Sequence, residues 1–241
     1  MRGLKPLLIA AERAWIPVER LRLMLSGQAR LARALRPRDN DLLGRIEEER
    51  RAMLRDNSPL VDGSLGPPAI YDRDVTVAGA CMVSKPRRAA WLLHSIAMEY
   101  RPETILELGT NVGISSAYLA ASGSKVVTLD ASPYRQRLAK SLHEKLGLDV
   151  DYVQGLFVDT LGPTLDGMGP IRMAFIDGHH QYQPTLDYFE AIVAKAAPGC
   201  VFVFDDIRWS SGMKRAWREL RRDPRFDAVS DLGGMGVGVL R

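Results

Sequence analysis

Acidic residues stand at the ends of four apolar runs in the chain, where buried strands would stop. Such runs are typical of parallel strands covered on both faces. The carboxyl ends of parallel strands meet at one edge of a sheet, and ligands of open α/β sheets bind there. We therefore expect five carboxylates to converge at one edge: Glu107, Asp130, Asp177, Asp205 and Asp206.

A glycine-bearing loop follows the first of these runs. Residues 104–116 read TILELGTNVGISS, in which Gly109 and Gly113 allow positive φ and close backbone approach to a ligand. A dinucleotide-binding loop has the spacing G-x-G-x-x-G, whose second glycine is absent here. Glu107 would repel a pyrophosphate but suits a cationic ligand rich in hydroxyls. Asp130, at the end of the next run, can accept hydrogen bonds from both hydroxyls of a ribose. An ordinary strand-turn-helix of another α/β protein is the alternative.

The three later acids form a second candidate site. Asp177, Asp205 and Asp206 offer hard oxygen ligands of the kind that hold Mg²⁺, and Mn²⁺ or Ca²⁺ would fit the same oxygens. Neighbouring strand residues point to opposite faces, so both Asp205 and Asp206 can ligate only if the chain has left the strand at Asp206. His180 is a candidate general base, since an ordinary histidine pKa of about 6.5 suits that role at neutral pH. His179 is a candidate fourth ligand or an exposed side chain.

These side chains need a scaffold of alternating strands and helices. The pattern predicts a doubly wound, mostly parallel seven-stranded α/β sheet of the Rossmann-like kind, closed by an antiparallel hairpin. Strands are expected at residues 105–108, 125–130, 150–154, 171–176, 200–204, 226–230 and 237–240. Helices are expected at residues 86–100, 114–121, 133–146, 184–197 and 213–221.

The chain begins with a basic, amphipathic stretch. Residues 1–38 hold nine basic side chains against two acidic ones, so the rest of the chain is slightly acidic and gives no sign of a nucleic-acid surface. We expect a helical arm at 1–60, a linker at 61–84 and the ligand-binding domain at 85–241. The arm is expected to pack on the domain or on a second subunit, which favours a homodimer. Contact with an anionic membrane through residues 1–38 is the alternative.

The remaining composition favours a cytoplasmic protein. Two cysteines, Cys81 and Cys200, give no disulfide framework and suit a reducing compartment. No apolar run approaches the roughly 20 residues that span a bilayer. Residues 7–11 are too short for the apolar core of a signal peptide.

The glycine loop with its acid resembles motif I of the class I S-adenosylmethionine-dependent methyltransferases. In that family the acidic residue and the loop surround the methionine and ribose parts of the cofactor. Gly155 and Leu156 directly follow the third strand, at the edge where an adenine could lie. The cofactor-binding residues implied are Glu107, Gly109, Thr110, Asn111, Gly113, Ser115, Asp130, Gly155, Leu156 and Asp177.

The second site is similar to that of metal-dependent O-methyltransferases of the catechol and macrolide-sugar types. Those enzymes place a metal-binding Asp after the fourth strand, a basic residue three positions on, and an acidic pair or Asp-Asn after the fifth. Four residues match this pattern one by one: Asp177, His180, Asp205 and Asp206. The resemblance implies that the three aspartates bind the metal and that the histidine is the base.

Residues 175–180 and 205–210 look most like an uncharacterised bacterial branch that reads IDGNH and DDIxWS. In this chain His179 stands where that pattern has Asn or Asp. Together these features predict metal-assisted methylation of a hydroxyl on a small phenolic or sugar-like molecule. Tyr71, Tyr182 and Trp209 are candidate walls of the acceptor pocket. Three alternatives remain: a nicotinamide oxidoreductase, a metal-independent methyltransferase, and a non-enzymatic scaffold that docks through its basic arm.

Overall fold

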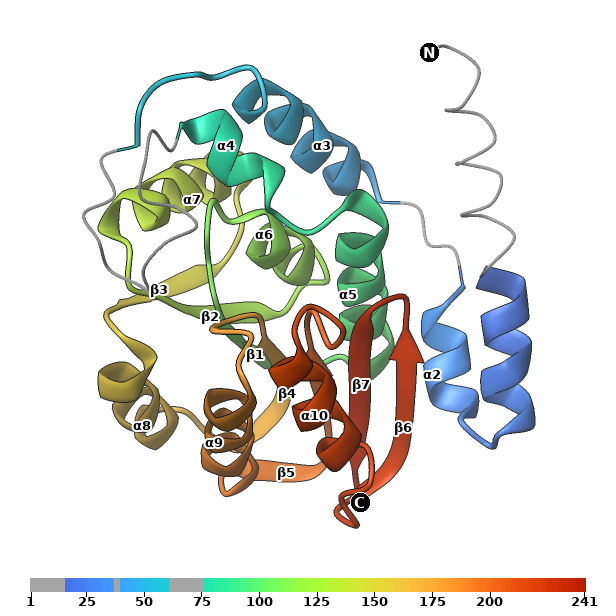
Figure 1. Ribbon diagram of the computed structural model, residues 1–241. Coiled ribbons are helices and arrows are strands. Elements are labelled where there is room, and N and C mark those ends of the chain that lie inside the picture. The colour runs from blue at the N-terminus through green and yellow to red at the C-terminus, as the bar shows by residue number, and fades with distance from the viewer. Residues whose placement is uncertain (1–15, 37–39, 61–75) are drawn as a thin grey trace.

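The computed structural model describes residues 16–36, 40–60 and 76–241, and within them seven strands form one sheet (Figure 1). The strands are β1 Thr104–Leu108, β2 Lys125–Asp130, β3 Val150–Gln154, β4 Ile171–Ile176, β5 Ala196–Phe204, β6 Phe226–Leu232 and β7 Met235–Leu240. Their order across the sheet is β3-β2-β1-β4-β5-β7-β6. The first five are parallel, and β7 pairs antiparallel with both β5 and β6. The predicted doubly wound sheet with a closing hairpin is confirmed.

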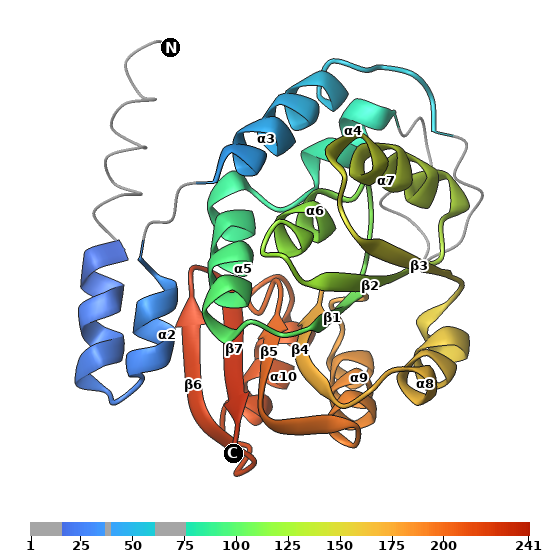
Figure 2. The ribbon, with the colours of Figure 1, turned by 180° about the vertical axis from the view of Figure 1, so that it is seen from behind.

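Helices cover both faces of the sheet (Figure 2). They are α2 Ala29–Ala34, α3 Asp41–Met53, α4 Val77–Met82, α5 Arg87–Tyr100, α6 Ile114–Ala120, α7 Pro133–Leu146, α8 Phe157–Gly167, α9 Tyr182–Val193 and α10 Ser211–Leu220, and residues 16–25 are also helical. Strand side chains alternate between faces, so Ile105 packs in the core under α2 and α5 while Leu106 packs in the core under α8, α9 and α10. The apolar runs read from the sequence are therefore buried on both sides.

The N-terminal arm is continuous with the domain. Leu31 of α2 and Leu35, the C-cap residue of that helix, belong to the same buried cluster as Ile96 of α5 and Val237 of β7. The predicted packing of the arm on the domain is thus seen for α2, whereas residues 1–15 lie outside the described part. None of the helices that the structure describes is long and apolar enough to cross a membrane.

Three stretches differ from the sequence prediction. The expected linker, 61–84, contains helix α4, and its residues 61–75 lie outside the described part. Residues 157–167 form α8, although no helix was expected there. The helix expected at 184–197 ends at Val193, and β5 has already begun at Ala196.

Candidate functional site

The acid of the first strand lies inside the fold. Glu107 is fully buried, and its Oε2 accepts a hydrogen bond of 2.7 Å from Thr128 Oγ1 and another from Ser116 Oγ. Burial raises the pKa of Glu107 to about 7. Through these hydrogen bonds the carboxyl group of Glu107 links β1 to β2 and to α6. Its direct contact with a cofactor stays a prediction.

The glycine loop is packed tightly against its neighbours. Gly109 has φ of +104°, and a Cβ added there would lie 2.1 Å from the backbone oxygen of Asp177. Gly113 has φ of +84°, and a Cβ there would lie 2.7 Å from Ala139 Cβ. Only glycine fits both positions, so the loop passes directly between the end of β4 and helix α7.

Two other predicted cofactor contacts, one in the loop and one in the first turn of α6, have buried side chains. Thr110 is fully buried and its hydroxyl lies 2.7 Å from that of Thr128. Ser115 is also buried, close to the Glu107 carboxyl group. In the structure both side chains serve the fold, and their contact with a cofactor stays a prediction.

Asp130 ties the end of β2 to the loop. Its Oδ2 accepts a hydrogen bond from the backbone amide of Asn111 and its Oδ1 accepts one from that of Ser132, both at 2.8 Å. The side chain of Asn111 reaches the other way and donates to the carbonyl oxygen of Ala80 at 3.0 Å. Asp130 is partly exposed, so ligand hydroxyls can reach its carboxylate.

The end of β3 lies beside Asp130, as the prediction required. The amide of Gly155 donates to the Asp130 carbonyl oxygen at 3.0 Å. Leu156 follows Gly155, with 43% of its surface exposed. The structure therefore brings together the residues predicted to hold a ribose and an adenine.

The second cluster surrounds a lysine that the sequence analysis did not single out. The Nζ of Lys85 contacts Oδ2 of Asp205 and lies 3.8 Å from Oδ2 of Asp177 and 4.0 Å from Oδ1 of Asp206. Lys85 stands just before α5, far from these acids in the sequence, so no spacing within a motif could have indicated it. The three carboxylates do converge, and they converge on this ammonium group.

His180 completes the cluster. Its Nε2 lies 3.5 Å from Oδ1 of Asp177 and 3.9 Å from Oδ2 of Asp206. Burial raises the pKa of Asp177, and the nearby positive charge of Lys85 opposes that rise. The carboxylate of Asp177 thus faces both Lys85 and His180.

Unusual backbone conformations gather at the same place. Among the described non-glycine residues, five have positive φ, and four of these lie at the site: Asn111, His179, His180 and Asp206. Such conformations are uncommon and concentrate at functional sites. The φ of +49° at Asp206 also confirms that the chain has left β5, which lets Asp205 and Asp206 face the same group.

One predicted side chain belongs to another environment. His179 contacts the hydroxyl group of Tyr188 through Nδ1 and packs edge-on against Phe157. Within the described residues, the grouping with metal-ligand spacing consists of Asp177, His180 and Asp205, whose ligand atoms lie within 4.8 Å of one another. His179 is therefore not a member, and neither is Asp206, which the sequence analysis had included among the ligands.

The predicted pocket walls are only partly placed at the site. The hydroxyl of Tyr182 donates to Glu219 at 2.6 Å and its ring lies under Arg215, so Tyr182 packs against α10 rather than facing the acids. Trp209, three residues after Asp206, is 65% exposed and remains a candidate wall. Tyr71 lies outside the described residues.

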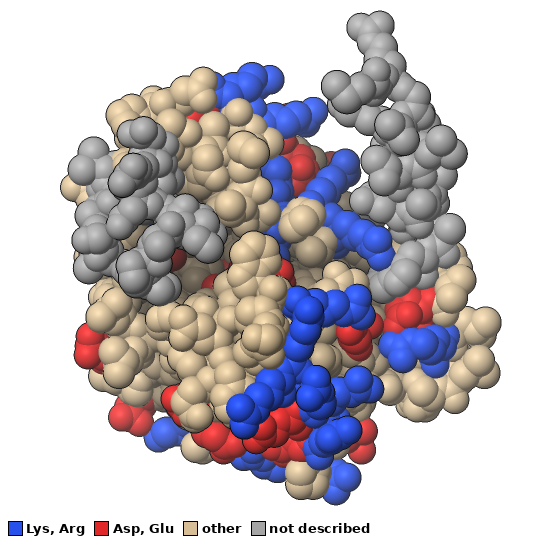
Figure 3. Space-filling model, viewed as in Figure 1, with Lys and Arg blue, Asp and Glu red and all other residues tan. Residues whose placement is uncertain are grey.

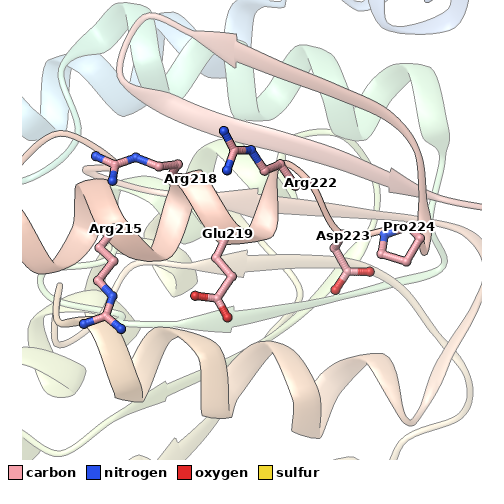
Figure 4. A pocket seen from close by; sticks show the side chains of 6 residues that line it. All are labelled: Arg215, Arg218, Glu219, Arg222, Asp223 and Pro224. Atoms are coloured by element: carbon pink, nitrogen blue, oxygen red, sulfur yellow. The ribbon is translucent and has the colours of Figure 1, made fainter.

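A separate depression lies on the outer side of α10 (Figure 4). Arginines and acids from the helix and the turn after it line this depression: Arg215, Arg218, Glu219, Arg222, Asp223 and Pro224. Basic and acidic side chains lie intermixed over this region (Figure 3). Pro224 lies just before β6. The first residue of β6, Phe226, pairs with Leu240, which lies at the opposite ends of the strands from the acids. The depression is therefore no part of the candidate site.

Comparisons with known proteins agree with this geometry. Residues 106–207 match a family described as a methyltransferase domain. A cypemycin N-terminal methyltransferase from a Streptomyces species is 32% identical over 136 residues, which are 55% of this chain and 54% of that protein. The chain therefore spans about half the length of that curated relative.

Solved structures share the fold. An O-methyltransferase from Bacillus cereus, in complex with SAH, superposes with a TM-score of 0.59 at 23% identity, over 85% of this chain and 92% of that one. The O-methyltransferase TomG from Streptomyces achromogenes, in complex with SAM, gives 0.59 at 20% identity, over 84% and 91%. At these identities the likeness concerns the fold. The protein has the fold of the class I methyltransferases, and residues 106–207 are its match to the methyltransferase domain family.

Proposed function

We propose that the protein is an S-adenosylmethionine-dependent methyltransferase that methylates a hydroxyl oxygen of a small phenolic or sugar-like molecule. The observation that carries the proposal is the contact between Gly109 and Asp177, which joins the predicted cofactor loop to the Asp177–His180 pair. The O-methyltransferases with the same fold, in complex with SAH or SAM, support the choice of cofactor.

The residues at the first half of the site suit this cofactor. The partly exposed carboxylate of Asp130 can accept hydrogen bonds from ribose hydroxyls, and the exposed side chain of Leu156 offers an apolar surface to a flat base. Gly109 and Gly113 let the loop pack directly against Asp177 and helix α7, which holds the predicted cofactor loop beside the acidic cluster.

The residues at the second half suit proton transfer. When bound, S-adenosylmethionine supplies a sulfonium methyl group, whose carbon–sulfur bond breaks with its electron pair passing to sulfur as the acceptor oxygen bonds to the carbon. His180 receives the acceptor's proton at Nε2, beside the carboxylates of Asp177 and Asp206 that stabilise the resulting imidazolium. Holding acceptor and donor at one edge of the sheet adds the advantage of proximity.

The expected divalent cation fits this site poorly. The ligand atoms of Asp177, His180 and Asp205 lie close enough together to hold a metal ion. However, the ammonium group of Lys85 already contacts Asp205 and lies within 4.0 Å of the other two acids. The proposed proton transfer to His180 therefore requires no metal.

A peptide amine is the second candidate acceptor, because the curated relative is an N-terminal methyltransferase. The test is transfer of radiolabelled methyl groups from S-adenosylmethionine to panels of phenols, sugars and peptides, in EDTA and in Mg²⁺. Label on a hydroxylated acceptor supports the proposal. Label on peptide amino termini alone would replace it by the second candidate.

A further inference from the structure

We propose that the ammonium group of Lys85 is the resident cation of the acidic cluster, and that this site consequently works without a divalent metal. The inference deepens the proposed function and rests on it. It makes Lys85 a positioning residue, which acts by holding Asp205, Asp177 and Asp206 in the orientation that His180 requires.

Burial makes the pairing of Lys85 with Asp205 mutual. The side chain of Lys85 is 9% exposed and that of Asp205 is 3% exposed. A buried charge is stable only when it is paired, so removing either partner would leave the other uncompensated. If Lys85 left the cluster, Asp205 would therefore remain as a buried charge without its partner, and the ammonium group would need a new environment.

The backbone at Lys85 is also fixed. Its carbonyl oxygen accepts a hydrogen bond of 2.6 Å from Nη1 of Arg50, and Arg50 is in turn held by Glu47 through a hydrogen bond of 3.0 Å. The next residue, Pro86, is the N-cap of α5, and its ring restricts φ. The start of the Lys85 side chain is thus anchored at the edge of the sheet, and its length carries the ammonium group to the acids.

The cluster has room for one cation. The ligand atoms of Asp177, His180 and Asp205 span at most 4.8 Å, and Lys85 Nζ lies against Asp205 in the same space. A divalent ion placed there would sit within a few ångströms of the ammonium group, and like charges at such distances repel strongly in a poorly hydrated site. Metal binding would therefore require Lys85 to be displaced.

An ammonium group can hold the three carboxylates in place as a metal ion would. It offers three N–H donors, and three carboxylates surround it. Two of these, Asp177 and Asp206, also face Nε2 of His180. The lysine thereby sets the position of the acids that flank the imidazole.

The test is a titration of the full-length protein with Mn²⁺, followed by the electron paramagnetic resonance signal of the free ion. The variant is Lys85→Met, which keeps most of the unbranched side chain and removes its charge. The matched control is Lys125→Met, because Lys125 also pairs with an aspartate, Asp151, at 2.7 Å but lies at the surface. Calorimetry with S-adenosylmethionine on each sample reports whether the cofactor site is intact.

We expect the wild type and the control to leave Mn²⁺ free, and Lys85→Met to bind it at least about tenfold more tightly. Adding Asp205→Asn to that variant should abolish the gain. Methyl transfer by the wild type should be the same in EDTA and in Mn²⁺, whereas Lys85→Met should be rescued by Mn²⁺. Stoichiometric Mn²⁺ binding by the wild type overturns the inference, even where the variant fails to fold. Loss of S-adenosylmethionine binding in the wild type would instead count against the proposed function.

Discussion

The α-carbon of Gly109 lies against the backbone carbonyl of Asp177, so closely that an added methyl group would be 2.1 Å from that oxygen. The amide of Asp177 also donates to the carbonyl oxygen of Leu108 at 2.9 Å. The glycine loop after β1 and the acid after β4 are thus built as one unit. A disturbance of the loop should therefore be felt at the acidic cluster.

Gly109→Ala should destabilise the protein and abolish cofactor binding. The new methyl group meets backbone rather than a movable side chain, and φ of +104° is unfavourable for alanine. We expect a loss of about 4 kcal/mol or more in the free energy of unfolding. Gly123→Ala is the matched control, because Gly123 has φ of +88° with nothing within 4 Å, and it should lose only about 1 kcal/mol. Urea unfolding measures both, and equal losses would show that the contact with Asp177 is unimportant.

His180→Gln should slow methyl transfer by about 10²-fold or more while leaving the affinity for S-adenosylmethionine nearly unchanged, because only proton acceptance is removed. The comparison variant is His179→Gln, whose side chain contacts Tyr188 rather than the acids. It should retain most of the activity. Initial rates with a saturating acceptor measure the effect, and similar rates for the two variants would remove His180 as the base.

Leu35→Ala should destabilise the entire domain, because α2 shares its core with the sheet. Leu35 is fully buried, and removing such a side chain typically costs about 2–5 kcal/mol. Leu25 lies in the same arm but is 80% exposed, so Leu25→Ala should change stability by less than about 0.5 kcal/mol. Circular dichroism during thermal unfolding should show one lowered transition for Leu35→Ala. An unchanged main transition would mean that the arm is energetically separate from the domain.

Glu107 should make the protein less stable as the pH rises towards neutrality. The carboxyl group titrates near 4.5 in the unfolded chain, whereas burial raises its pKa to about 7 in the fold. Between these values the folded protein holds a proton that the unfolded chain has lost, so the free energy of unfolding falls as the pH rises from about 4.5 to about 7. The difference reaches roughly 3 kcal/mol and is constant above that window.

Glu107→Gln removes this titration while keeping the shape of the side chain. Urea unfolding of both proteins between pH 5 and pH 8 isolates the effect, since other groups contribute equally to each. The wild type should lose stability relative to the variant across that range. A difference that does not depend on pH would show that Glu107 is ionised in the folded protein.

The sheet could be predicted because its strands are continuous apolar runs that end in acids or glycines, as at Asp130 and Asp177. Helix α8 could not, since Gly162 and Pro163 in its middle are typical of a loop. Burial of Leu161 and Leu165 on one side of the helix outweighs that local preference.

The sequence prediction begins β5 too late along the chain, for a related reason. Pro198 directly follows the helix expected at 184–197, but in the structure it lies where the pairing of β4 with β5 is irregular, between the partners of Ile171 and Met173. A proline is tolerated at such a bulge because no ladder hydrogen bond is needed from it. The local sequence cannot distinguish these two uses of proline.

The convergence of the acids could be predicted from strand topology, but their partner could not. Strand ends share an edge, which brings Asp177, Asp205 and Asp206 together. Lys85 comes from the start of a helix, and only the folded chain brings it to them. The sequence thus suggested a metal among these acids but could not indicate that Lys85 contacts Asp205.

The measurement that tests the central claim most directly is calorimetric titration of S-adenosylmethionine into the wild type, Asp130→Ala and Asp151→Ala, in EDTA. Asp151 lies on neighbouring β3 with its carboxylate exposed, so it controls for the loss of one surface charge. We predict binding at one site per chain, weakened at least about tenfold in Asp130→Ala and unchanged in Asp151→Ala. Absence of binding by the wild type, or equal affinity in all three proteins, would contradict the account.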